Sequence, residues 1–416
     1  MNKGKTYILF IVLTLIYFGL NSQRLYGQLA ISPQITVKQE YDDNVNLTSG
    51  KTDSIKADFV THVMPVIALK HLYKNHSFHI DLNGNYRRGF QSDLSNLNMN
   101  FAGGFSLNFN GGLNLYANNN YLTASFDQAL YDEVGVYIRN SNTFSAGMSY
   151  IYSPVNRLML DVNYRNKQDL FDNEDLKVNR IINYLQGRLS LPLSRSLLGY
   201  GDLQMEKQDS KERRSRNYLN NQIVGGLQWK GTARVTFYLE GGYGQITYDL
   251  PEMQDFKNAV GKVGMSVLFT ESTTGQVMAG QDGYGNVVFD ALFAYRYSER
   301  TSLSLTANKE TRSSFSTLHK NGIIEYTAGQ LQIIKTMFDK FVMVINGTYQ
   351  LQESAAVNNN TRNLKHTVWL EYLSLSYNIQ DWITAGMNGQ YATRVSYLNL
   401  YDYNDSRIGV FIRLKK

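Results

Sequence analysis

Residues 76–90, which read HSFHIDLNGNYRRGF, alternate apolar and polar side chains almost without interruption. One set comprises Phe78, Ile80, Leu82, Gly84 and Tyr86, and the other comprises His79, Asp81, Asn83, Asn85 and Arg87. Residues 97–109 repeat the pattern, with mainly large apolar side chains at odd positions and small or polar ones at even positions. Successive side chains of a strand point to opposite faces, so each run predicts a ribbon with one apolar and one polar face.

Similar runs recur from about residue 30 to the C-terminus, and two all-β folds could use them. A soluble sandwich has shorter strands and turns its apolar residues inward. A transmembrane barrel has long strands, apolar residues toward lipid, and Asn, Gly and charges in a wet lumen. The long runs, 30 Tyr, 20 Phe and only 5 Pro favour the barrel, because aromatics form its interfacial girdles and Pro is excluded from paired strands. We therefore predict an all-β, transmembrane, antiparallel up-and-down β-barrel in a bacterial outer membrane.

The N-terminus has the pattern of a secretory signal. Lys3 and Lys5 precede an uncharged apolar stretch over residues 7–20, which is short for a span of roughly 20 residues. Small residues follow, and we place cleavage after Gly27, with Ser22 as an earlier alternative. A membrane-anchoring helix is the competing interpretation. The prediction is a signal peptide over 1–27 and a single barrel domain over 28–416.

Composition narrows the class further. The chain has no Cys, which argues against a lipoprotein anchor and a disulfide framework. The formal charge of +6 includes Lys3, Lys5 and Arg24, so the chain from residue 28 carries +3. That charge is too small to favour a nucleic-acid partner.

Short turns and longer polar segments alternate along the chain, as periplasmic turns and extracellular loops do in outer-membrane barrels. Short connections are predicted at 73–75, 110–112, 153–156, 194–196, 231–233, 270–273, 298–300, 339–340 and 380–381. Longer segments are predicted at 42–54, 125–136, 169–177, 209–217, 250–257, 313–321, 353–363 and 397–405. This division gives 18–20 strands, with residues 274–280 as the weakest candidate. The last strand is expected near 407–414. Barrels often end on an aromatic residue, and because this sequence ends FIRLKK (411–416), that assembly signal is displaced or weakened.

Segments near the start resemble a known family. They read YDDNV (41–45), ADFV (57–60), MP (64–65), KNHSF (74–78) and YRR (86–88). The later segments SPVNR (153–157) and RTSLSL (300–305) also fit its turn-to-strand pattern. The chain is similar to the second family of β-barrel porins, outer-membrane barrels often encoded with capsule or exopolysaccharide synthesis machinery. The resemblance implies an outer-membrane pore for the last step of exopolysaccharide export, and it implies no catalytic residues.

The predicted polar face supplies the candidate lumen-lining residues: Asp81, Asn83, Arg87, Asn98, Asn100, Asp161, Asn163, Arg165, Asp202, Gln204 and Glu206. Mixed charges with many amides suit passage of hydroxyl-rich sugars, which need exchangeable hydrogen bonds and no deep trap. Any porin lumen has a similar composition, so the set predicts a channel without identifying its cargo.

Other polar motifs carry weaker predictions. His76 and His79 fall on opposite faces of one strand, which disfavours a metal pair. The glycines at 241–244 lie inside a strand pattern, and we interpret them as space for a bulky neighbour rather than a phosphate loop. His366 with Ser374 or Ser376 is the only hydrolase-like pairing considered, and no motif supports it.

Two charged segments are expected in extracellular loops. The basic residues Lys211, Arg213, Arg214 and Arg216 could attract an anionic glycan or lipopolysaccharide phosphates, or could simply keep a loop soluble. The acidic run at 169–175 lacks the spacing of a dedicated calcium loop.

The sequence thus predicts a non-enzymatic outer-membrane pore for exopolysaccharide or capsule export that needs no cofactor. Its expected partners are outer-membrane lipid and lipopolysaccharide, a polysaccharide polymer and periplasmic export machinery, with no nucleic acid. The alternatives are a general or sugar-uptake porin, a plugged barrel that displays loops for adhesion or scaffolding, and a barrel enzyme.

Overall fold

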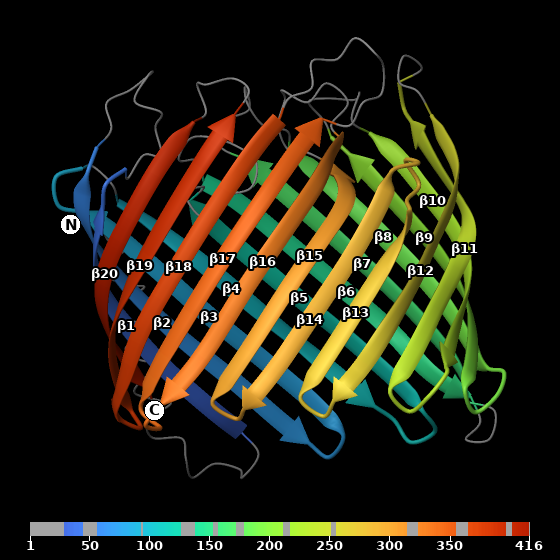
Figure 1. Ribbon diagram of the computed structural model, residues 1–416, viewed down its shortest axis with the longest axis horizontal. Coiled ribbons are helices and arrows are strands. Elements are labelled where there is room, and N and C mark those ends of the chain that lie inside the picture. The colour runs from blue at the N-terminus through green and yellow to red at the C-terminus, as the bar shows by residue number, and fades with distance from the viewer. Residues whose placement is uncertain are drawn as a thin grey trace.

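The computed structural model describes residues 29–44, 56–92, 95–125, 138–152, 157–171, 179–210, 217–250, 255–313, 323–354, 365–396 and 402–415. These residues form twenty strands of a single barrel wall (Figure 1). The predicted signal peptide over 1–27 lies outside the described residues. No helix in the described part of the chain is long and apolar enough to cross a membrane.

The strands follow in chain order and are inclined to the barrel axis (Figure 1). They are β1 (Leu29–Asp42), β2 (Asp58–Tyr73), β3 (His76–Gly89), β4 (Ser95–Asn108), β5 (Leu113–Ser125), β6 (Ile138–Tyr152), β7 (Leu158–Phe171), β8 (Arg180–Pro192), β9 (Leu197–Asp209), β10 (Tyr218–Lys230), β11 (Val235–Tyr248), β12 (Phe256–Thr270), β13 (Thr273–Gln281), β14 (Val287–Ser298), β15 (Thr301–Ser313), β16 (Ile323–Met337), β17 (Phe341–Ser354), β18 (Lys365–Gln380), β19 (Ile383–Ser396) and β20 (Tyr403–Lys415).

Every strand pairs antiparallel with its neighbours in the sequence, and β20 pairs antiparallel with β1. The closing register matches Gln34 with Lys415 and Asp42 with Arg407. Closure removes both sheet edges, so the wall satisfies its backbone hydrogen bonds internally, as a span through lipid requires. The predicted all-β, up-and-down barrel of 18–20 strands is confirmed, with twenty.

Eight of the nine predicted short connections join consecutive strands at one end of the barrel, which we call the turn end. The ninth, at 153–156, lies outside the described residues. The turn between β4 and β5 uses Gly111 and Gly112 at φ values of 102° and 87°, which glycine adopts at little cost. The opposite end, called the loop end, carries the longer connections. The weak candidate at 274–280 is the full strand β13, the shortest of the described strands with nine residues.

Two loop-end connections were not predicted, those over 90–94 and 282–286. The second is a compact turn in which Asp282 Oδ1 accepts hydrogen bonds from Tyr284 N at 2.9 Å and Asn286 N at 3.0 Å. Gly285 follows at φ 86°. An Asp side chain that bonds the backbone two residues onward is a common way to close such turns.

The outer face is apolar and is bounded by aromatic side chains. Near the loop end, Tyr41 packs on Phe59 with ring centroids 5.2 Å apart, and Tyr349 packs on Trp369 at 5.9 Å. Near the turn end, Trp229 stacks on Phe237 at 5.4 Å. Exposed Leu, Val, Ile and Met side chains lie between these levels. The band and its two girdles have the pattern of a transmembrane barrel.

Candidate functional site: the barrel lumen

The inner face is the polar face that the sequence predicts. On β9, Leu203 is 54% exposed on the outside, whereas Asp202 beside it is 7% exposed on the inside. Strand alternation and register place all eleven predicted lumen residues on the inner face. Their participation in transport stays a prediction.

Charged and tyrosine side chains line the inner wall across β7–β11. Asp161, Arg188 and Asp202 are paired in register on β7, β8 and β9. The Arg188 guanidinium lies 3.9 Å from the centre of the Tyr200 ring. The Tyr200 hydroxyl donates to Glu240 Oε2 on β11 at 2.8 Å. We call these five residues the lumen belt, in which Arg188 lies in register between two carboxylates.

The other predicted residues join similar pairs. Arg165 lies over the Tyr184 ring at 5.0 Å, and Glu206 accepts a hydrogen bond from the Tyr218 hydroxyl at 2.6 Å. Gln186 Nε2 donates to Asp202 Oδ2 at 2.7 Å. Sequence reasoning missed Arg188, Tyr200 and Glu240, although their alternation within β8, β9 and β11 assigns them to the inner face.

Glycine makes room for the Tyr200 ring. A Cβ atom at Gly226 on β10 would overlap that ring, so the ring lies flat along the wall. The glycines at 241–244 were predicted to leave space for a bulky side chain. At Gly242, a Cβ atom would instead overlap the backbone of Ile223 on β10. No following helix occurs there, since Gly242 lies within β11.

The inner face changes character toward the loop end, where it is buried and partly apolar. Val60, Ile246, Ile324, Val368 and Ala392 project inward near this end, and each is almost completely inaccessible to solvent. Inner residues nearer the turn end are mostly half-buried or exposed. The inner wall is therefore more accessible to solvent near the turn end than near the loop end.

An aromatic cluster forms part of the buried loop end. The Tyr218 and Tyr248 rings have centroids 6.1 Å apart, and Phe256 packs against both Tyr248 at 6.4 Å and Tyr284 at 5.6 Å. Burial raises the pKa of the Tyr284 hydroxyl well above its usual range, so this group stays neutral at physiological pH.

A charged cluster occupies the loop end where β1 meets β20. Arg407 Nε lies 2.7 Å from Asp405 Oδ2 and 3.2 Å from Asp42 Oδ2. The predicted lumen residue Arg87 belongs to this cluster, with its Nη2 atom 3.9 Å from Asp42 Oδ2. Glu40 contacts Lys38 and lies near His62. Pairing of β1, β2 and β3 brings Arg87 close to Asp42, and pairing of β1 with β20 adds Asp405 and Arg407 to the cluster.

The structure also places the histidine and charged motifs that were considered from the sequence. His76 and His79 lie on opposite faces of β3, as predicted. His366 Nδ1 is 2.8 Å from Ser396 Oγ, whereas Ser374 and Ser376, the serines considered from the sequence, lie further along β18. Asp169, the first residue of the acidic run, is buried and bonded to Arg180 Nε at 3.1 Å. The rest of that run, and the basic residues Lys211, Arg213, Arg214 and Arg216, lie outside the described residues.

The closed wall, the apolar outer band with two aromatic girdles and the polar inner face define an outer-membrane β-barrel protein. Its fold is similar to that of the FrpB iron transporter from Neisseria meningitidis, with 8% identity, a TM-score of 0.52, and coverage of 95% of this chain and 83% of that chain. It is also similar to a mutant of the ferric enterobactin receptor PfeA from Pseudomonas aeruginosa, with 9% identity, a TM-score of 0.51, and coverage of 93% and 80%.

At these identities the likeness establishes the barrel fold alone. No family model matches the chain, and no curated protein matches it either.

Proposed function

We propose that this barrel is an outer-membrane pore through which a hydroxyl-rich polymer, an exopolysaccharide or capsule chain, leaves the cell. The observation that carries the proposal is the lumen belt inside an apolar outer wall. The lumen belt combines three carboxylates, Asp161, Asp202 and Glu240, with the single cation Arg188, so a neutral or weakly charged chain meets polar, hydrogen-bonding groups rather than an apolar barrier.

Tyrosines add a second feature suited to sugars. The rings of Tyr184 and Tyr200 each lie beside an arginine on the inner wall, and each combines an apolar face with a polar tip. A sugar ring can contact the face while its hydroxyl groups exchange hydrogen bonds with the neighbouring charged groups. Exchange of many weak contacts supports movement rather than tight retention.

The proposal assigns no chemical reaction to the chain. Ser396 and His366, the Ser–His pair noted above, are both buried, so a substrate cannot reach them in this conformation. The pore would take its polymer from periplasmic export machinery at the turn end, and lipopolysaccharide would surround its outer wall. Synthesis upstream would drive movement, and no cofactor is needed.

The buried loop end supports a second candidate, a barrel that is closed at rest. Inward-facing Val60, Ile324 and Val368 leave little accessible surface at that end. Two proteins with a similar fold are described as an iron transporter and a ferric enterobactin receptor. On this alternative, the chain takes up a compact solute or displays its loops around a closed lumen.

Planar-bilayer conductance of the refolded chain from residue 28 to residue 416 separates these candidates. The pore proposal predicts stable conductance that purified polysaccharide blocks from the turn end, and weaker block after Tyr200→Leu. A Trp229→Leu variant on the outer wall is the matched aromatic control and should retain full block. Conductance that is blocked by small sugars but not by polymer supports an uptake porin. Absence of any conductance supports the closed barrel.

A further inference from the structure

Three aspartates gather at the loop end where the first and last strands meet. Asp42 is the last residue of β1, Asp43 follows it, and Asp405 lies near the start of β20. One carboxylate oxygen from each lies within 4.8 Å of the other two. Oxygens that surround Ca²⁺ at about 2.3–2.6 Å are up to roughly 5 Å apart, so this spacing fits one such ion.

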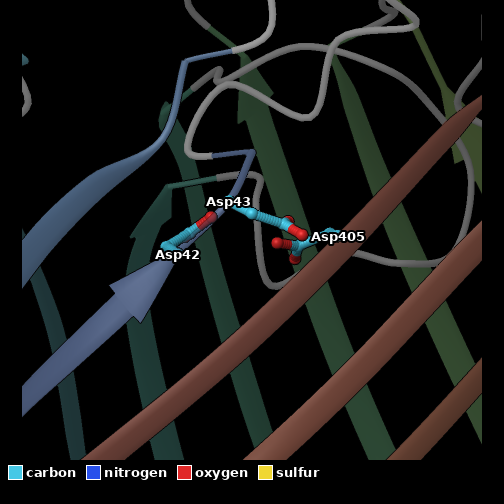
Figure 2. Close-up of side chains that lie close together, drawn as sticks. All are labelled: Asp42, Asp43 and Asp405. Carbon is cyan, nitrogen blue, oxygen red and sulfur yellow. The ribbon is translucent and has the colours of Figure 1, made fainter.

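Backbone hydrogen bonds fix two of these side chains in position. Ser406 N donates to Asp43 Oδ1 at 2.6 Å, and Asn44 N donates to Asp42 Oδ1 at 3.0 Å. Figure 2 shows the Asp43 and Asp405 side chains directed toward each other across the two strands. A carboxylate oxygen has more than one lone pair, so a hydrogen bond from the backbone leaves it able to bind a cation.

Two carboxylate oxygens in this group lack a hydrogen-bond donor. Asp405 is 1% exposed and Asp42 is 0% exposed, and neither Asp405 Oδ1 nor Asp42 Oδ2 accepts a hydrogen bond. Arg407 Nε carries a single hydrogen, which it donates to Asp405 Oδ2 at 2.7 Å. Asp42 Oδ2 therefore receives charge attraction from Arg407 at 3.2 Å but no hydrogen bond. A buried carboxylate oxygen without a donor is costly unless a positive ion lies beside it.

The nearby positive side chains do not balance the acidic ones. Lys38 forms an ion pair with Glu40, which is not one of the three aspartates. Arg407 balances one aspartate charge, and Arg87 approaches only to 3.9 Å from Asp42. Among the residues that the structure describes, one of the three aspartate charges is thus left without a close cation.

We propose that Asp42, Asp43 and Asp405 bind a divalent cation, for which Ca²⁺ is the best fit, and that this ion joins β1 to β20 at the loop end. Calcium accepts six to eight oxygen ligands in flexible geometry, which mixed carboxylate and water ligands satisfy. Magnesium requires a regular octahedron at about 2.0–2.1 Å, which three side chains fixed on two strands meet less easily. The ion offsets the uncompensated charge and adds a cross-link between residues that are far apart in the sequence.

Calcium titration of the folded barrel in detergent tests the proposal. Wild-type protein, stripped with EDTA and dialysed, should bind Ca²⁺ saturably at one site by calorimetry, and its thermal unfolding midpoint should rise with Ca²⁺. Asp405→Asn and Asp43→Asn keep the shape of the side chain and remove one charge. Each should lose the calcium-dependent shift.

Asp58→Asn is the matched control, because it removes another buried loop-end carboxylate whose oxygens are all engaged by Phe59, Phe90, Gln91 and Ser92. This variant should keep the full calcium response even if it is less stable. A wild-type midpoint that is indifferent to Ca²⁺, as expected if Asp42 and Asp405 instead share a proton, overturns the proposal. So does an unchanged calcium response in Asp405→Asn.

Terbium luminescence gives a readout that does not depend on the stability of Asp405→Asn. Tyrosine excitation of wild-type protein should sensitise bound Tb³⁺, Ca²⁺ should displace it, and Asp43→Asn should abolish the signal. Asp43 is only partly buried, so this variant disturbs packing least. Sensitised emission that is equal in wild type and Asp43→Asn contradicts the assignment.

Discussion

Ser406 and Asp43 are joined by two hydrogen bonds although 363 positions separate them in the sequence. Asp43 N donates to the Ser406 carbonyl oxygen at 3.1 Å, and Ser406 N donates to Asp43 Oδ1 at 2.6 Å. Asn44 Nδ2 adds a bond to the Asn404 carbonyl oxygen at 2.9 Å. These bonds continue the β1–β20 ladder past the end of β1, so the barrel wall is closed up to its loop end.

Asp58→Ala should strongly destabilise the barrel. Asp58 lies at the start of β2, and its two oxygens accept hydrogen bonds from the backbone of Phe59, Phe90, Gln91 and Ser92 and from the Ser92 hydroxyl. Loss of this charged acceptor leaves several donors unpaired, at a cost of about 3 kcal/mol. Guanidinium unfolding in lipid vesicles measures the change, and a loss below about 1 kcal/mol would contradict the assigned role.

Gly226→Ala should disturb the lumen belt. The added methyl group overlaps the Tyr200 ring and should push it into the lumen, away from Glu240. Overpacking of this kind costs about 1–3 kcal/mol. Gly241→Ala is the matched control, because nothing lies within 4 Å of a Cβ atom there. Equal stability of the two variants by guanidinium unfolding would show that the Tyr200 ring can move away from the added methyl group at no cost.

Arg188→Ala should make the pore more selective for cations. The substitution removes the positive member of the lumen belt and leaves Asp161, Asp202 and Glu240. A unit charge about 4 Å from a passing ion in water contributes on the order of 1 kcal/mol, or about fivefold in relative permeability at most. Reversal potentials in a salt gradient measure the ratio. Lys207→Ala on the outer face is the control, and an Arg188→Ala potential equal to that control would count against an ion path along this wall.

Glu371→Leu should stabilise the barrel in lipid. Glu371 faces outward from within β18 and accepts a hydrogen bond from Trp369 Nε1 at 2.8 Å. Its neighbours in register are Gly347 and Tyr391, so no basic residue lies directly opposite it. Removing a carboxylate from the lipid face should add about 1 kcal/mol to the free energy of unfolding. Glu353→Leu, at the loop end of β17, should change little. Destabilisation by Glu371→Leu would show that the bond to Trp369 outweighs the lipid penalty.

The barrel was predictable from the sequence because its signals are local. Alternation with period two gave the inner and outer faces of β3 and β4, and Gly111, Gly112 and similar residues marked the turns. The connection that follows β3 escaped prediction because Asp58, which accepts the backbone hydrogen bonds of residues 90–92, is more than thirty residues away. The turn over 282–286 did carry a local signal, an Asp followed by two glycines.

The site was less predictable than the wall. Alternation assigned Asp161 and Asp202 to the lumen but could not show that Arg188 lies between them, because register between strands depends on turn geometry. Asp42 and Asp405 meet only because the first strand pairs with the last. The buried loop end was also unpredictable, since inward-facing Val60 and Ile324 have the same sequence pattern as lipid-facing residues.

The antiparallel pairing of β1 with β20 also brings Leu29 and Lys415 to the same end of the barrel, the turn end. A short linker between these residues would turn the wall into a covalent ring without reversing any strand. Opening that ring at another turn, such as the one after Ser298, gives a circular permutant with the same strand neighbours. The order of strands along the chain is therefore separable from their order around the barrel.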